Sequence, residues 1–409
     1  MTYQAYGNDN DVWERETLTN GFWGLNDSLA DSGIEVGFGI TNIYQINLRG
    51  GNGTSTKEHR GRYTGSYDLE VTADMERLLG LDGGSVYVHV EGLWPKDVDI
   101  DTTSISSALG VNGDAGGRRT MDITELWYER SFLNDTLFLR IGKLDITGGF
   151  ECRGCPVSFD GSAFANDETA QFLNASLVNN PSIPFPDKGL GLVLYFNPIE
   201  WWYASVGAID AQTDARETGF RTALHKQDYF FYAFETGITP QSDSDNGPLQ
   251  GAYRVGLWYD PQPKANTDPA IAKNYRDDIG FYLSLDQMLD KENADPEDSQ
   301  GLGAFFRYGY AHSERNAIAN FWSIGAQYQG LIQGRNDDVL GIGYSQAIFS
   351  DRAKATYTEN QETVVELYYN ALLSPWLSIT PNIQFIGNPG GSRTPKDAVV
   401  LGVRAQTTF

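Results

Sequence analysis

Long apolar runs are missing from this chain of 409 residues. No segment supplies the roughly 18 consecutive apolar residues of a membrane-spanning helix, and the mean hydropathy is -0.39. A helical membrane protein is therefore excluded. A membrane location is not, because a transmembrane β-barrel turns every second side chain toward a water-filled lumen and so has a hydrophilic average.

Positive charge is scarce as well. The chain has 30 Lys and Arg against 54 Asp and Glu, which gives a formal net charge of -24. Phosphate binding requires clustered Lys and Arg, so nucleic acid is not expected as a partner. We expect the surplus acidic residues to lie in solvent-exposed loops.

Cysteine and histidine are nearly absent. The two cysteines, Cys152 and Cys155, form one CxxC motif, and none of the four His residues is near it in sequence. A redox pair and half of a metal site are functional interpretations, but without a second CxxC we favour a small disulfide that pins a long loop in an oxidising compartment. No catalytic, metal or cofactor site is expected, apart from the alternative of Ca²⁺ bound by Asp160, Asp167 and Glu168, whose spacing matches no EF-hand loop.

A signal peptide is not apparent either. Met1 is followed by Thr-Tyr-Gln-Ala-Tyr, with no basic segment ahead of an apolar core. For an exported protein, this sequence would therefore be a mature chain with an added initiator Met.

The chain does contain segments in which apolar side chains alternate strictly with small or polar ones. In residues 399–409, apolar side chains occupy every second position, and mostly small or polar side chains occupy the others. Such a strand suits a sheet that meets lipid on its outside and water on its inside. The expected lipid face comprises Val399, Leu401, Val403, Ala405 and Phe409.

Sixteen alternating segments follow one another along the chain. The connections between most of them alternate between short and long, as in outer-membrane barrels, whose short turns face the periplasm. An even number of strands then places both chain ends in the periplasm. The segments are expected at residues 34–48, 63–75, 85–94, 122–132, 136–145, 189–197, 201–210, 229–238, 251–260, 278–287, 301–311, 321–330, 338–347, 362–372, 376–386 and 398–409.

A short helix is expected before the first of these segments. Residues 17–32 carry apolar side chains at roughly helical spacing, and Gly33 supplies a stop signal. We therefore expect residues 1–33 to form an N-terminal segment with a helix at the periplasmic mouth. Residues 34–409 are expected to form one all-β domain, an antiparallel transmembrane β-barrel.

Eight short segments carry a family resemblance. They are FWGLND at 22–27, LADSGI at 29–34, LRIGKLD at 139–145, GLVLYFNPIEWW at 191–202, GLIQGR at 330–335, DDVLG at 337–341, ETVVEL at 362–367 and NPGG at 388–391. In this order they resemble the carbohydrate-selective porin family OprB over nearly the whole chain. The cysteine pair and the strongly acidic loops depart from the family pattern.

The resemblance implies a sixteen-stranded barrel in a bacterial outer membrane, through which glucose-like mono- or oligosaccharides diffuse without catalysis. It also implies contact with outer-membrane lipid. The terminal Phe409 is similar to the signal read by outer-membrane assembly machinery. The chain is expected to be a monomer or a homo-oligomer.

Selectivity in a pore depends on its width and on the polar groups at its narrowest point. Sugars need hydrogen-bond donors and acceptors for their hydroxyls and an aromatic surface for the ring face. The candidate pore-lining residues, all on the polar phase of expected strands, are His89, Glu91, Glu125, Trp127, Arg140, Arg254, Trp258, Arg307, Glu366, Asn382 and Arg404.

Two groups of these candidates have alternative roles. The arginines either hydrogen-bond sugar hydroxyls or pair with Glu91, Glu125 or Glu366 to brace the wall. Trp127 and Trp258 either stack on sugars or belong to a membrane-interface belt or to side-chain packing.

The connection 146–188 is the longest. It contains the CxxC motif and the run PSIPFP at 181–186, which resists helix formation and stiffens an extended segment. We predict that it folds inward and narrows the pore, with a surface lid as the alternative.

A sugar-selective porin is the function that these features favour. The first alternative is a general or ion-selective diffusion porin on the same fold. The second is a soluble all-β glycan-binding protein or hydrolase, since paired Asp and Glu serve glycosidases.

Overall fold

The computed structural model describes residues 11–53, 61–95, 104–114, 121–146, 164–165, 169–186, 188–213, 225–295 and 298–409. Within these ranges, no helix is long and apolar enough to cross a membrane. Cys152, Cys155, Asp160, Asp167 and Glu168 lie outside the described residues, so the disulfide and the Ca²⁺ alternative stay predictions.

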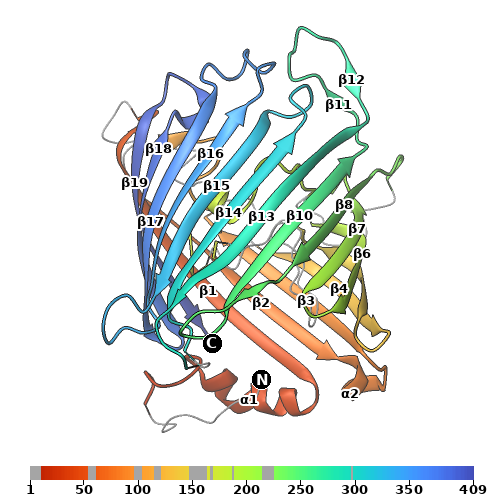
Figure 1. Cartoon of the computed structure of the whole chain (residues 1–409), viewed down its shortest axis with the longest axis vertical. Coiled ribbons are helices and arrows are strands. Elements are labelled where there is room, and N and C mark those ends of the chain that lie inside the picture. Colours follow the sequence, from red (N-terminus) through yellow and green to blue (C-terminus); the bar gives the residue numbers. More distant parts are fainter. Residues whose placement is uncertain are drawn as a thin grey trace.

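Sixteen long antiparallel strands close into a barrel (Figure 1). Each pairs with its neighbours in chain order, and the last strand pairs with the first, with Gly39 opposite Thr408 and Tyr44 opposite Val403. The strands are β1 (Ile34–Gly51), β2 (Arg62–Asp74), β3 (Gly84–Trp94), β4 (Asp122–Phe132), β5 (Leu137–Leu144), β6 (Gly189–Ile199), β7 (Trp202–Asp210), β8 (Phe230–Ile238), β10 (Leu249–Asp260), β13 (Asp278–Lys291), β14 (Gly301–Ala311), β15 (Ile318–Gln329), β16 (Val339–Phe349), β17 (Gln361–Ser374), β18 (Leu377–Gly387) and β19 (Lys396–Thr408). The sixteen-stranded barrel predicted from alternation is confirmed, with strand ends that differ from the prediction by a few residues.

Several small elements complete the described chain. The two-residue strand β9 extends the sheet beside β10, and β11 and β12 form a separate ribbon. These elements are α1 (Asn20–Asp31), α2 (Met75–Leu79), α3 (Ala175–Val178), β9 (Gln241–Ser242), β11 (Lys264–Ala265), β12 (Asn274–Tyr275) and the 3-10 helix η3 (Pro389–Gly391).

The two ends of the barrel differ in the length of their connections. Tight turns such as 133–136 and 375–376 lie at the end that also holds the two ends of the described chain (Figure 1). The long connections, including 95–121 and 145–188, leave from the opposite end. Four connections at the tight-turn end, 75–83, 239–248, 292–300 and 330–338, are longer than the remaining turns there.

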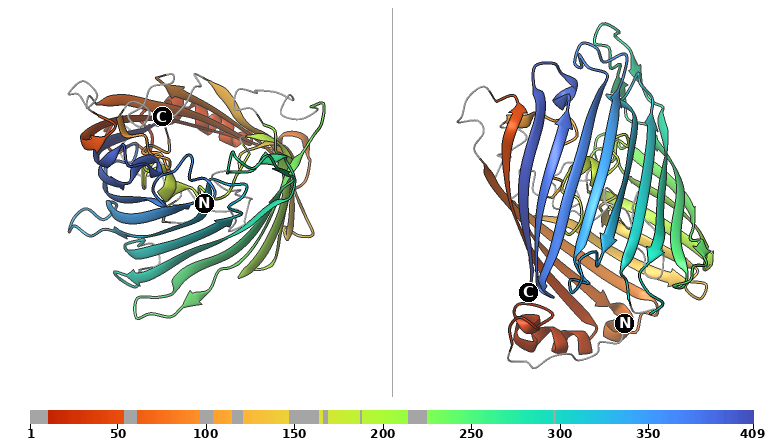
Figure 2. Two further views of the ribbon diagram at one scale, coloured as in Figure 1. Left: turned by 90° about the horizontal axis from the view of Figure 1, so that it is seen from above. Right: turned by 60° about the vertical axis from the view of Figure 1, so that its left-hand side comes forward.

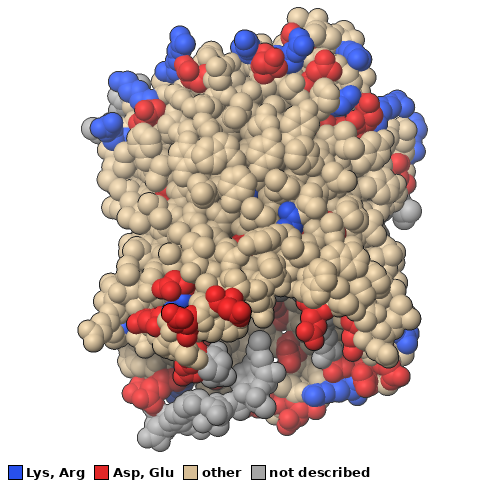
Figure 3. Space-filling view, in the orientation of Figure 1, with Lys and Arg blue, Asp and Glu red and all other residues tan. Residues whose placement is uncertain are grey.

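The two faces of each strand differ as the alternation predicts. On β19, Leu401 and Val403 point outward and are 43% and 39% exposed, whereas Val400 and Arg404 point inward and are fully buried. Figure 3 shows the resulting surface, a middle band nearly free of charged side chains between two charged rims. An apolar band of this kind matches the hydrocarbon layer of a membrane.

The helix α1 lies at the tight-turn end, beneath the barrel (Figure 1). Its first turn is left-handed, because residues 21–24 have φ values from 55° to 84°. Gly21 and Gly24 adopt this conformation readily, whereas Phe22 and Trp23 do so rarely. No residue of α1 is buried, and Trp23 is 84% exposed.

Candidate functional site

Two connections fold into the barrel and lie against its inner wall. Their longest described stretches are residues 104–114, between β3 and β4, and residues 169–186, between β5 and β6; we call them the first and second inward segments (Figure 2). The predicted narrowing of the lumen by the connection 146–188 is confirmed for its described residues. The first inward segment was not predicted, and it narrows the lumen further.

Glu362 on β17 anchors the first inward segment. Its carboxylate accepts hydrogen bonds from the backbone N–H of Ala108 at 2.8 Å, from that of Gly390 at 2.6 Å and from the Ser107 hydroxyl. Hydrogen bonds to an ionised acceptor are stronger than neutral ones. A single buried carboxylate therefore ties this segment to the turn between β18 and β19.

Glu366, four residues further along β17, anchors the second inward segment. It accepts from the backbone N–H of Leu173 at 2.9 Å and of Asn174 at 2.8 Å. The Asn174 amide donates to Gln384 Oε1 at 2.9 Å, and Gln384 Nε2 donates to the Val111 carbonyl at 3.0 Å. Gln384 on β18 thus links the two inward segments.

Two of the candidate arginines also hold the second inward segment. Arg307 on β14 donates to the Val178 carbonyl at 2.7 Å, and Arg404 on β19 donates to the Gln171 carbonyl at 2.8 Å. Both side chains are fully buried. Their partners include backbone carbonyls of the segment, a role that neither interpretation from the sequence contained.

Apolar side chains seal the contact between the inward segments and the wall. In the first segment Ile105, Leu109 and Val111 pack against inward-facing Val364 and Val400. In the second, Phe172, Leu177 and Val178 pack against Phe305 and Tyr368. Full burial of one such side chain contributes about 1.5–3 kcal/mol, so these apolar contacts help to hold both inward segments against the wall.

The wall from β2 to β5 retains solvent contact. His89, Glu91, Glu125 and Trp127 share the lumen face of β3 and β4 and are each partly exposed. The His89 ring lies 3.0 Å from Asp68 Oδ1 through Nε2 and 2.7 Å from the Thr124 hydroxyl through Nδ1. We call this surface the accessible wall.

Aromatic and charged groups form one stack across the accessible wall. The rings of Tyr87 on β3 and Trp127 on β4 are stacked at 5.0 Å, and the Arg140 guanidinium from β5 lies 3.9 Å from the Trp127 ring centre. Trp127 Nε1 donates to Glu125 Oε2 at 3.0 Å, and Arg140 pairs with Glu129 at 2.8 Å. The indole is therefore flanked by Tyr87 and Arg140 from its two neighbouring strands, a stack that the sequence alone did not predict.

Lys188 closes the upper part of this wall, where the second inward segment runs into β6. Its ammonium lies 2.8 Å from Glu91 Oε2 and 3.5 Å from Asp145 Oδ2. Glu91 therefore faces a cation, although not one of the arginines proposed from the sequence.

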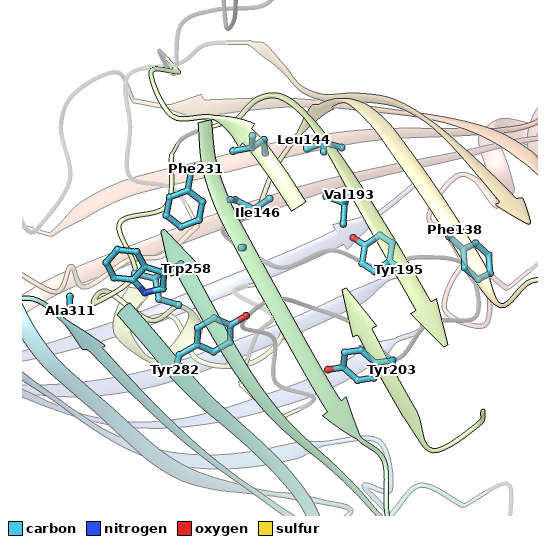
Figure 4. Close-up of a cluster of buried hydrophobic side chains, with 13 residues drawn as sticks. Phe138, Leu144, Ile146, Val193, Tyr195, Tyr203, Phe231, Trp258, Tyr282 and Ala311 are labelled. Carbon is cyan, nitrogen blue, oxygen red and sulfur yellow. The ribbon is translucent and has the colours of Figure 1, made fainter. Parts of the chain in front are cut away.

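A second apolar cluster lines the lumen face from β5 to β14 and includes Ile183 of the second inward segment (Figure 4). Within it, Trp258 is 2% exposed and stacks on Phe231 at 6.1 Å with an interplanar angle of 17°. Tyr203 and Tyr282 both donate to Glu235, each at 2.8 Å. Trp258 is thus a packing residue in this cluster and does not present a free ring face.

Arg254 and Asn382 are the remaining candidates, and both are buried. Arg254 pairs with Asp286 at 2.6 Å on the adjacent strand β13. Asn382 on β18 lies against Gly402, where an added Cβ would come within 2.7 Å of its Oδ1. Neither residue belongs to the accessible wall.

Sequence reasoning missed several groups that define this lumen. Glu362, Glu235 and Asp286 are carboxylates on the inward phase of their strands, so strand parity was a signal that could have marked them. Across the part of the chain that the structure describes, no cluster of three or more His, Cys, Asp or Glu is placed to hold a metal ion.

Comparison with known proteins decides the family. The sequence profile of the carbohydrate-selective porin family OprB matches residues 58–409. The chain belongs to this family. It is therefore an outer-membrane porin that conducts carbohydrates, and the family is one of channels and not of enzymes.

Individual relatives agree with this assignment. Porin B of Pseudomonas aeruginosa is 24% identical, and the alignment covers 95% of this porin and 90% of that protein. The putative porin QuiX of Acinetobacter baylyi is 21% identical over 98% of this porin and 95% of its own length. The high pH structure of Pseudomonas putida OprB superposes with a TM-score of 0.82 at 19% identity and covers 97% of this porin and 99% of that chain, which supports the fold alone.

Proposed function

We propose that glucose-like mono- or oligosaccharides cross this porin along the accessible wall of β2 to β5. The observation that carries the proposal is the uneven filling of the barrel. The first inward segment lies against β1, β2, β17 and β18, and the second lies against β14, β17, β19 and the cluster around Trp258, while His89, Glu91 and Trp127 keep contact with solvent.

The chemistry of the accessible wall suits sugars. His89, Glu125 and the paired Glu91 and Lys188 offer donors and acceptors within one surface, and sugar hydroxyls need both. The ring of Tyr87, which is stacked on Trp127, adds an apolar surface for the C–H face of a sugar ring. Because donors, acceptors and aromatic rings lie on the same wall, we favour passage of sugars over a general diffusion pore.

The orientation and assembly of the porin are further parts of the proposal. Both ends of the described chain lie on the side of the tight turns, which in outer-membrane barrels faces the periplasm. Phe409 packs on Phe38 at 5.3 Å between ring centres and donates its N–H to the Phe38 carbonyl at 3.0 Å. This position at the rim of the closing strand pair is accessible to assembly machinery that reads a C-terminal aromatic residue. The working unit is a monomer or a homo-oligomer.

Planar-bilayer recording tests the path. We expect glucose to reduce the ion current of the wild-type porin in a concentration-dependent way, and Tyr87→Ala to weaken this block about fivefold, as loss of an aromatic contact of ~1 kcal/mol would do. Trp322→Ala is the matched control, because its ring lies 4.9 Å from that of Tyr344 on the lipid-facing side. An unchanged block in Tyr87→Ala would place the sugar path elsewhere, and no block in the wild type would contradict the carbohydrate function.

A further inference from the structure

Large apolar side chains are exposed on the N-terminal segment, at the tight-turn end of the barrel. Trp23 and Leu25 of α1 are 84% and 56% exposed, and Trp13, ahead of the helix, is 56% exposed. No residue of α1 is buried. An exposed apolar surface of this kind marks a site of contact with a membrane or with another protein.

A strained turn holds Trp23 in its exposed position. Phe22 and Trp23 have φ values of 55° and 60°, in the left-handed region that large side chains rarely adopt. The Phe22 N–H donates to the Thr19 hydroxyl at 3.1 Å, and the Trp23 N–H donates to the Thr19 carbonyl at 2.9 Å. Strain of this kind persists only where the surrounding structure fixes it, and it is frequent at functional positions. The exposure of Trp23 is therefore built into the turn.

The N-terminal segment is joined to the lipid-facing surface of the barrel at its rim. The Trp13 ring stacks on the ring of Trp376, in the turn between β17 and β18, with 5.7 Å between the ring centres. Trp376 Nε1 also donates to the Val12 carbonyl at 2.7 Å. Leu373, near the end of β17, is 47% exposed on the lipid-facing side of that strand. Trp13 therefore continues the apolar outer surface of the barrel beyond the ends of its strands.

A second set of contacts holds α1 at the rim. The Asn26 amide donates to the Val36 carbonyl of β1 at 2.9 Å, and the Arg77 guanidinium donates to the Ala30 carbonyl at 3.3 Å. The helix lies crosswise beneath the strand ends (Figure 1). Because the strands of a barrel cross the membrane, a helix in this position runs along the membrane surface.

We propose that the N-terminal segment anchors the porin in the headgroup layer of the leaflet at the tight-turn end, with Trp13, Trp23 and Leu25 inserted among zwitterionic phospholipids. Indole rings favour the boundary between headgroups and acyl chains, and helices with an exposed apolar face lie in it. The occupant is lipid because the stack of Trp13 on Trp376 makes this surface continuous with the lipid-facing band. The only charged side chains of α1 are acidic, so the helix offers no cation that would select anionic headgroups.

Tryptophan fluorescence of the whole porin in phosphatidylcholine vesicles tests the anchor. The difference in emission between the wild type and Trp23→Phe is the emission of Trp23, and Trp13→Phe gives that of Trp13 in the same way. We expect both to be quenched when the lipids carry bromine in the upper part of their acyl chains, and less when the bromine is near the chain ends. Heat-modifiable gel mobility verifies that each variant barrel is folded.

Two further variants calibrate the measurement. Trp322→Phe removes a ring on the lipid-facing side, and the emission of that ring should also be quenched by brominated lipid. Trp258→Phe removes a ring that is 2% exposed within the lumen cluster, and its emission should respond neither to brominated lipid nor to acrylamide in the water. If acrylamide quenches the emission of Trp23 and brominated lipid does not, the ring lies in water and the anchor is refuted. If neither quencher acts on it, protein covers the ring, which overturns the proposal as well.

Discussion

Replacing Glu366 with Leu tests whether a buried carboxylate holds the second inward segment in the lumen. In the wild type, its two oxygens accept the backbone N–H groups of Leu173 and Asn174. A leucine accepts neither, and a buried donor without a partner costs about 1–3 kcal/mol. The free energy that keeps the segment against the wall should therefore fall by about 2–6 kcal/mol.

Release of the segment widens the lumen, so we expect Glu366→Leu to raise the single-channel conductance and to admit larger oligosaccharides in liposome swelling. Glu359→Gln is the matched control, because that carboxylate pairs with the exposed Arg393 in the outer connections. Heat-modifiable gel mobility verifies that each variant barrel is folded. A folded Glu366→Leu porin with wild-type conductance and size limit would refute the reasoning, since Arg307 and Arg404 would then suffice to hold the segment.

Three further predictions follow from buried charges and from the lipid face. Arg140→Ala should lower the free energy of unfolding in detergent by about 3–5 kcal/mol, since it leaves Glu129 buried without its cation. Denaturant titration measures this free energy. In the control, the double variant Arg140→Ala/Glu129→Gln, the free energy of unfolding should fall much less. Leu401→Arg should lower the free energy of unfolding in lipid vesicles by about 2–4 kcal/mol if that side chain faces the bilayer midplane. Asp397→Arg, at the end of the strand, is the control and should lower that free energy only slightly. Burial tends to raise the pKa of Asp338, but hydrogen bonds from Arg335 and Tyr369 hold that pKa below 3.8. The turn before β16 therefore keeps this stabilisation above pH 3.8 and loses it as the pH falls through the lowered value. Thermal unfolding below about pH 4 should show this loss in the wild type and not in Asp338→Asn, and identical acid profiles would contradict it.

The barrel wall was predictable from the sequence because the pattern of side chains that a membrane strand needs lies within each single strand. A strand between lipid and water needs alternation at period two, and that period is visible in any single segment. On β19, the predicted lipid face and the inward Arg404 both match the structure. Strand order followed as well, since every strand pairs with its neighbours in the chain.

The interior of the barrel was less predictable because its partners are distant in sequence. Arg307 binds a carbonyl 129 residues away, and Arg404 binds one 233 residues away. The partners of inward-facing Val364 and Val400 are also distant in sequence, since an apolar side chain in the lumen is stable only when another segment covers it. Periodicity shows that a side chain points inward but does not identify what it meets there.

The anchoring of the inward segments also has a consequence for how the barrel forms. Glu362 meets Ala108 across 254 residues, and Thr41 meets Gln406 across 365 residues when the first and last strands pair. Contacts of such large sequence separation form late and slowly, because the entropy of closing the chain is lost before they stabilise it. The buried carboxylates of β17 thus have no partners until the early connections already lie within the curving sheet. We expect the inward segments to dock on the inner face of the sheet before β1 pairs with β19. The closing of the barrel would then be the last step of its assembly.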